Sequence, residues 1–69
     1  MRQSITARRP YRLYLRGATI MQEQRHEAVL ASDEEARQLA MLMLDEQADY
    51  PCAEIWDGAR LVCTLRRGE

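Results

Sequence analysis

Apolar and polar residues alternate strictly over residues 11–16, "YRLYLR". A two-residue period of this kind predicts a β-strand with one buried face. The apolar side holds Tyr11, Leu13 and Leu15, and the opposite side holds Arg12, Tyr14 and Arg16. Gly17 interrupts the alternation, and we expect "ATIM" (18–21) to return as a second strand. The polar stretch "QEQRHE" (22–27) is then expected to form a loop, with a continued edge strand as the alternative.

A helical pattern follows Ser32. Ser32 and the acidic residues at 33–35 predict a capping box with negative charge at the positive end of the helix dipole. The helix should run from residue 33 to about residue 48, because Pro51 disfavours helical geometry at Tyr50. At 100° per residue, the apolar stripe has Ala36, Leu39, Ala40 and Met43 at its centre, Leu42 and Leu44 on its flanks, and Met41 on the polar side. We expect this stripe to be core, and the alternative is that its excess width contacts another copy or a partner.

Two apolar segments on either side of Asp57-Gly58 predict a β-hairpin. A two-residue turn at Asp57-Gly58 would place Cys52 opposite Cys63, but it mixes apolar and polar residues on each face. A three-residue loop over 56–58 instead pairs Glu54 with Arg60 and separates the two faces. Because the buried face normally sets the register, we expect the three-residue loop, with the glycine in the left-handed conformation as a bulge.

This register decides where the two thiols lie. The residues directed toward the helix are Ala53, Ile55, Leu61, Cys63 and Leu65, and those directed away are Cys52, Glu54, Arg60, Val62, Thr64 and Arg66. Cys52 and Cys63 then lie on opposite faces, so their Cβ atoms point apart and no disulfide is expected between them. We expect Cys63 to be buried and Cys52 to lie near the surface.

The predicted order is strand, strand, helix, strand, strand. Its simplest arrangement is one small antiparallel sheet with the helix packed on one face, an α+β fold. A chain of 69 residues holds one domain and buries only about 60% of the surface of its unfolded form. We expect this domain over residues 11–67. Residues 1–10 lack periodicity and end in Pro10, so we expect them to form a mobile, Arg-rich arm.

Composition and charge narrow the class of protein. Hydrophobic residues make up 46% of the chain and charged residues 30%, which is too apolar for disorder, and no apolar run approaches the ~18 residues of a membrane span. The net charge of −1 hides an asymmetry, with five Arg and no acid in residues 1–17 but six acids against Arg37 in residues 33–49. Such a dipole can orient partners or pair copies head to tail. With no secretory signal, we expect a cytoplasmic protein with reduced thiols.

Candidate chemistry is sparse. The one histidine, His26, lies in a polar stretch without a spaced ligand partner, so no metal site is expected. Cys52 with His26 is an imaginable nucleophile and base, but no pattern places them together and no Gly-rich phosphate loop accompanies them. We therefore expect no enzyme activity, no cofactor and no small-molecule substrate, since so thin a domain lacks the usual pocket of about 300 Å³ or more.

The face of the sheet away from the helix is the expected binding surface. It should display Arg12, Tyr14, Arg16 and Arg60, with Trp56 at the hairpin end. One interpretation is a protein interface, including self-association, because Tyr, Trp and Arg are enriched at binding hot spots. The alternative is a single-stranded nucleic-acid platform with bases stacked on the aromatic rings. The net charge and the acidic helix count against the alternative.

Three segments carry a resemblance: "YRLYLRGATI", "ASDEEARQLA" and "EIWDGARLV". They resemble a group of short bacterial proteins of unknown function that are common in rhizobia and related α-proteobacteria. That group has a Tyr-rich opening strand with Arg, an acidic helix start and a closing aliphatic-Trp-x-Gly-x-Arg hairpin. These features correspond here to residues 11–15, residues 33–40, and Ile55, Trp56, Gly58 and Arg60. The resemblance implies a bacterial cytoplasmic origin and implies no activity.

Overall fold

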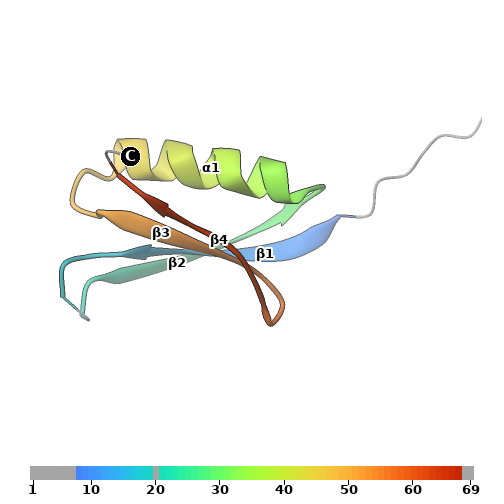
Figure 1. Cartoon of the computed structure of the whole chain (residues 1–69), viewed down its shortest axis with the longest axis horizontal. Coiled ribbons are helices and arrows are strands. Elements are labelled where there is room, and N and C mark those ends of the chain that lie inside the picture. Colours follow the sequence, from blue (N-terminus) through green and yellow to red (C-terminus); the bar gives the residue numbers. More distant parts are fainter. Residues whose placement is uncertain (1–7, 20, 68–69) are drawn as a thin grey trace, which may run out of the picture.

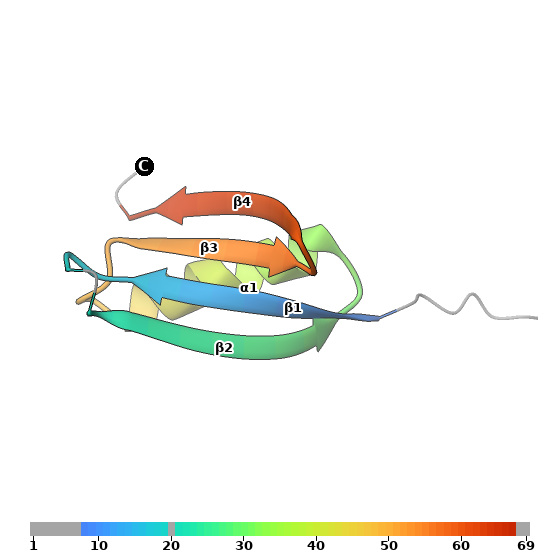
Figure 2. The same ribbon diagram turned by 90° about the horizontal axis from the view of Figure 1, so that it is seen from below.

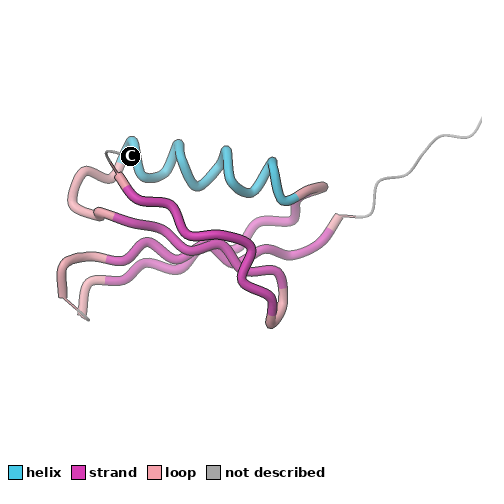
Figure 3. Tube along the Cα trace, in the orientation of Figure 1, coloured by secondary structure: helices cyan, strands magenta, loops and turns pink. Residues whose placement is uncertain are grey.

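The sheet of this protein is antiparallel, with strand order β2-β1-β3-β4, and a helix lies across one of its faces (Figure 1). The computed structural model describes residues 8–19 and 21–67. Over those residues the elements are β1 (Arg9–Arg16), β2 (Glu23–Leu30), α1 (Asp33–Glu46), β3 (Cys52–Asp57) and β4 (Arg60–Arg66) (Figure 3). The predicted α+β fold and its order of elements are confirmed.

β1 is a central strand and begins two residues earlier than expected. Arg9 lies opposite Leu30 and Pro10 opposite Val29, so both belong to the sheet and not to an arm. Pro10 is tolerated because β3 pairs with β1 only from Tyr11 onward, which leaves β1 with one neighbour at this position. The domain boundary expected at residue 11 is therefore wrong by two residues. The predicted arm otherwise falls mostly on residues 1–7, which lie outside the described residues.

The second strand is not where the apolar pattern placed it. β2 is formed by the polar stretch and its continuation to Leu30, while Ala18, Thr19 and Met21 lie in the turn before it. The Gly17 N–H donates to the Gln22 carbonyl at 2.7 Å, closing this turn, and a Cβ at Gly17 would collide with the Gln22 side chain. β2 borders only β1, and most of its residues are exposed. Because the strand has little buried surface, its sequence need not alternate between apolar and polar residues.

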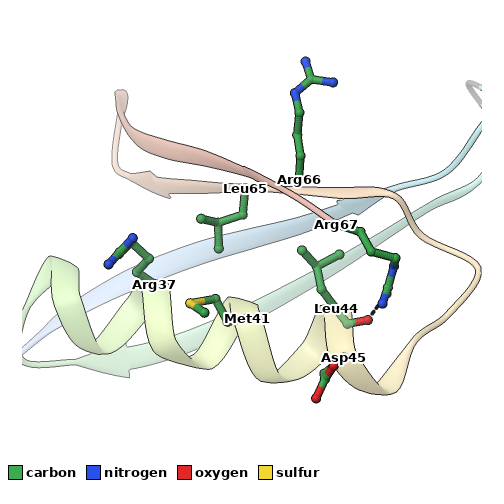
Figure 4. Close-up of a pocket in the computed structure, with 7 residues that line it drawn as sticks. All are labelled: Arg37, Met41, Leu44, Asp45, Leu65, Arg66 and Arg67. Carbon is green, nitrogen blue, oxygen red and sulfur yellow. Dashed lines mark hydrogen bonds between the residues drawn. The ribbon is translucent and has the colours of Figure 1, made fainter. Parts of the chain in front are cut away.

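α1 begins as expected and ends two residues early. Ser32 Oγ accepts a hydrogen bond from the Glu35 N–H at 3.1 Å, and Glu35 Oε1 accepts one in return from the Ala31 N–H at 2.9 Å. Glu46 is the last helical residue, and Arg67 follows β4 back to this end of the helix. Its guanidinium donates to the Leu44 carbonyl (Figure 4) and to the Gln47 carbonyl at 2.8 Å. Arginine thus satisfies carbonyls that the helix end leaves free.

The core lies between α1 and the two central strands. Its buried side chains are Tyr11, Leu13 and Leu15 from β1, Ala53 and Ile55 from β3, and Ala36, Ala40 and Leu44 from α1. The two alanines let the helix lie close to the sheet, and Leu39 and Met43 cover the margin. Leu42, expected on the edge of the buried stripe, is 61% exposed, because Leu44 takes the core position on the opposite flank.

The β3–β4 hairpin differs from both registers considered. Its turn is Gly58-Ala59 between the paired residues Asp57 and Arg60, with Gly58 at φ 64°. Trp56 pairs with Leu61, but the next residue of β3, Ile55, pairs with Cys63, so β4 carries one extra residue as a bulge. The predicted three-residue loop is therefore wrong.

The bulge changes which residues share a face. Glu54 lies opposite Thr64 and not Arg60. Leu61, opposite Trp56, points away from the helix and is 47% exposed, whereas we expected it in the core. Beyond the bulge, the helix-facing positions return to the expected phase at Cys63 and Leu65, which lie opposite two fully buried residues of β3. The one extra residue in β4 thus allows a two-residue turn and still places Cys63 and Leu65 on the helix side of the sheet.

Both cysteines are free, as predicted. Cys52 lies opposite Arg66 on the face away from α1, and Cys63 lies opposite buried Ile55 on the helix side. Cys63 is only partly buried, because β4 is at the edge of the sheet, but that burial still raises the pKa of its thiol.

Candidate functional site

The face of the sheet away from α1, here called the open face, has no element over it in the described part of the chain (Figure 2). Alternation along β1 puts its buried residues under α1 and its other residues on this face. The strand register then fixes the remaining members. The open face consists of Pro10, Arg12, Tyr14 and Arg16 from β1, Glu23, Arg25, Glu27 and Val29 from β2, Cys52, Glu54 and Trp56 from β3, and Leu61, Thr64 and Arg66 from β4.

Arg12 joins the two aromatic side chains of the open face. Its guanidinium carbon lies 5.7 Å from the ring centroid of Tyr14 and 6.0 Å from that of Trp56, within cation–π range of both. It donates a hydrogen bond to the Tyr14 hydroxyl at 2.9 Å and another to the Gly58 carbonyl of the hairpin turn. One side chain therefore ties the rings to each other and to the turn.

Arg16 continues this row on the other side of Tyr14. Its guanidinium carbon is 5.2 Å from the ring centroid, and it forms ion pairs with Glu54 at 3.0 Å and Glu23 at 3.3 Å. The hydrogen bond that Arg16 donates to Glu54 is the main reason that the pKa of Arg16 is raised. Glu54 also accepts a hydrogen bond from Trp56 Nε1 at 3.2 Å. Glu54 thus contacts the two ends of the row, Trp56 and Arg16, and helps to hold the row in one arrangement.

Arg60, the fifth expected binding residue, is not on the open face. It pairs with Asp57, which lies opposite buried Tyr11, so both point to the helix side. The Arg60 guanidinium binds Asp33 at 3.1 and 3.3 Å and Asp57 at 2.9 Å. The two carboxylates raise the pKa of Arg60. Its role is to hold the hairpin against the start of α1.

A network that we call the ion-pair cluster surrounds this contact. It consists of Arg9, Tyr11, Asp33, Asp57 and Arg60. The Tyr11 hydroxyl donates to Asp33 Oδ1 at 2.7 Å, and Arg9 Nε lies 3.2 Å from Asp57 Oδ2. This network was not predicted from the sequence beyond the acidic helix start, because its members come from four separate elements.

Acid should weaken the ion-pair cluster. Hydrogen bonds from Arg60 and Tyr11, in that order, lower the pKa of Asp33 in the folded protein. A carboxyl with a lowered folded pKa adds stability above its unfolded pKa of about 4, and this is lost as the pH falls through the folded value. We therefore expect the wild-type melting temperature to fall steeply below about pH 4 and the Asp33→Asn variant to have a shallower acid limb.

The measurement is thermal melting followed by circular dichroism from pH 6 downward. Asp45→Asn is the matched control, since Asp45 is exposed and forms no ion pair among residues 8–19 and 21–67. It should keep the wild-type acid limb. Equal slopes for wild type and Asp33→Asn would show that Asp33 does not carry the acid sensitivity.

The structure therefore gathers four of the five expected residues, Arg12, Tyr14, Arg16 and Trp56, into one row across β1 and β3. Glu54 was not among the expected binding residues, although its position two residues before Trp56 placed it on the same face. Glu23 was not expected on this face because it was predicted to lie in a loop. Leu61 was missed because the bulge has no signal in the apolar pattern.

The open face is nearly balanced in charge. It carries four arginines, Arg12, Arg16, Arg25 and Arg66, against three glutamates, Glu23, Glu27 and Glu54, a formal difference of one positive charge. A shallow hollow lies at its centre between the two aromatic rings, Arg12, Arg16 and Glu23. Within the described residues, His, Cys, Asp and Glu side chains form no group of three or more that could bind a metal ion.

No known protein family, curated protein or solved structure matches the chain. The resemblance to short α-proteobacterial proteins therefore stays a prediction. None of the described helices has the length and apolar character needed to cross a membrane.

Proposed function

We propose that the protein is a small binding module that recognises another protein chain, either a second copy or a different protein, through the open face. The observation that carries this proposal is the row from Trp56 through Arg12 and Tyr14 to Arg16. Aromatic residues and arginine dominate the energetics of protein interfaces, because they bury large surfaces and still donate hydrogen bonds. Leu61 and exposed Val29, at opposite edges of the sheet, extend the apolar area.

Preorganisation supports the proposal. Binding usually costs about 0.5–1.5 kcal/mol for each flexible side chain that becomes ordered. Arg12 and Arg16 are already held by stacking and by hydrogen bonds to Tyr14, Gly58 and Glu54. A partner that docks on this row would therefore meet side chains that lose little further freedom.

Single-stranded nucleic acid remains the alternative, and the electrostatics favour it less. Stacking of bases requires free ring faces, whereas arginines lie over the rings of Tyr14 and Trp56. Phosphates require unpaired cations, whereas Arg16 is bound to two glutamates. We propose no catalytic role. A cytoplasmic setting is part of the proposal, because two free thiols suit a reducing compartment.

Site-specific photocrosslinking in the native host tests the proposal. A photoreactive amino acid at Leu61 sits beside Trp56 on the open face, and one at Met21, 87% exposed in the β1–β2 turn, is the control position. We expect a discrete crosslinked protein, either a second copy or another chain, from position 61 and not from position 21. Crosslinks to nucleic acid would favour the alternative, and the absence of any crosslink from position 61 would contradict both.

Trp56→Ala should abolish the crosslink without unfolding the domain. Truncation of a central interface tryptophan typically costs about 2 kcal/mol or more of binding, roughly a thirtyfold loss of affinity. Trp56 is only half-buried and lies outside the core between α1 and the sheet, so circular dichroism should stay close to that of the wild type. A variant that unfolds would instead show that the ring acts mainly in folding.

A further inference from the structure

The outer side of α1 is a second surface, separate from the open face because the sheet lies between them (Figure 1). Met41 is 52% exposed and Leu42 is 61% exposed. Together with Gln38 and Asp45 they line a shallow hollow on this side of the helix. Neither side chain belongs to the core or to the partly buried residues that pack against it.

The charges beside this apolar pair have a definite order. Arg37, Met41 and Asp45 are spaced by four residues and form one row that winds from the β4 flank of the helix toward its outer side. Figure 4 shows Arg37 and Met41 on the flank of α1 next to Leu65 of β4, with Asp45 pointing away from the sheet. A cation thus lies one turn before Met41 and an anion one turn after it. Arg37 is 49% exposed and its only ion pair among the described residues is a long one, 3.8 Å to Glu34.

We propose that α1 packs antiparallel against α1 of a second copy, with the two-fold axis between Met41 and Leu42. Reversal of the chain direction about this axis brings Arg37 close to Asp45 of the second copy, and the two-fold axis repeats this pair. On the other flank, Leu42 meets its own counterpart and Gln38 faces Glu46 of the second copy. Charge complementarity favours this occupant, since every polar position near the axis meets an opposite charge or a hydrogen-bonding partner.

The same pattern rejects the parallel arrangement. Parallel helices in register would set Arg37 against Arg37 and Asp45 against Asp45, with Met41 between two like-charged contacts. Like charges that face each other across an interface are a common means of excluding a wrong arrangement. Arg37, Met41 and Asp45 therefore pair favourably with the same residues of a second copy only when the two helices are antiparallel.

The contact should be weak and reversible. α1 has 14 residues and is about 21 Å long, so one pair of helices buries less surface than a stable interface of about 1,200 Å² or more. We therefore expect a monomer at low protein concentration and a dimer at high concentration.

Sedimentation equilibrium of the full chain over a wide concentration range tests this interface. The wild type should approach twice the monomer mass. Met41→Asp should stay monomeric, and Asp45→Arg, which sets two arginines opposite each other, should weaken the dimer at least about tenfold. Arg near the C-terminal end of a helix is favourable to the helix, so loss of the dimer in Asp45→Arg cannot be ascribed to unfolding.

Charge exchange provides the decisive comparison. Arg37→Asp alone should also weaken the dimer, while Arg37→Asp combined with Asp45→Arg restores the attraction with exchanged signs and should return the dissociation constant to within about threefold of the wild type. Met21→Asp, an apolar-to-acid change at an exposed position in the β1–β2 turn, is the matched control and should leave the dimer unchanged. A wild type that stays monomeric at every concentration would overturn the interface. So would a dimer that ignores the α1 variants but dissociates with Leu61→Asp, a result that would place self-association on the open face.

Discussion

Leu13→Ala is expected to leave about half or more of the molecules unfolded at room temperature. Leu13 is fully buried, lies in the middle of central strand β1 and faces Ile55 of β3 in the register. Removing a buried leucine side chain costs about 2–5 kcal/mol, because apolar contacts are lost and the surroundings fill the cavity only in part. A core of this size typically supplies a net stability of no more than roughly 3–5 kcal/mol. The two quantities are nearly equal.

Urea denaturation followed by circular dichroism measures this loss. Leu42→Ala is the matched control, because it removes the same atoms from a side chain that is 61% exposed, and it should change stability by less than about 0.5 kcal/mol. The comparison is made at low protein concentration, where contacts between copies do not contribute. A Leu13→Ala protein with the wild-type midpoint would mean that β1 is not the centre of the core.

Met43→Asp and Met41→Asp should have opposite outcomes although they make the same change two residues apart. Met43 packs against the core, and an aspartate there loses the apolar contact and brings a carboxylate to its margin. The last turn of α1 also disfavours negative charge, because the helix dipole is negative at that end. We expect Met43→Asp to lose about 2–4 kcal/mol, enough to unfold much of the protein.

Met41→Asp should fold, because Met41 is 52% exposed on the outer side of the helix. Circular dichroism and the dispersion of amide resonances distinguish a folded from an unfolded chain for both variants. Equal loss of structure in the two variants would show that the buried side of α1 is misassigned. The pair also separates folding from association, since Met41→Asp is the change expected to abolish the helix-mediated dimer.

Sequence reasoning succeeded where one face of an element is buried. In β1, alternate residues meet the helix, so apolar and polar positions separate and the pattern is readable. In α1, the Ser32 cap and the line from Ala36 to Ala40 have direct local causes. In the row from Trp56 to Arg16, Arg12, Tyr14 and Arg16 were predicted to share a face because they alternate with the buried residues of β1.

The failures have equally specific causes. β2 has one neighbour and little burial, so its polar residues resemble a loop. The position of the bulge in β4 depends on how turn geometry and core packing are balanced across the hairpin, and no single residue type marks it. Arg60 was assigned to the wrong face for this reason, and its contact with Asp33 joins residues 27 positions apart.

The bulge has a consequence for solubility. The two outer strands of an open sheet expose unpaired backbone groups that can template further strands and lead to aggregation. β2 carries charged side chains at Glu23, Arg25 and Glu27, which repel such additions, whereas β4 has charged residues only at its ends and lacks this protection over its middle. The extra residue in β4 breaks the regular ladder and increases local twist, so a flat strand from another molecule cannot pair along its whole length. The bulge that places Leu61 on the open face therefore also reduces the tendency of β4, the more apolar edge strand, to pair with strands of other molecules.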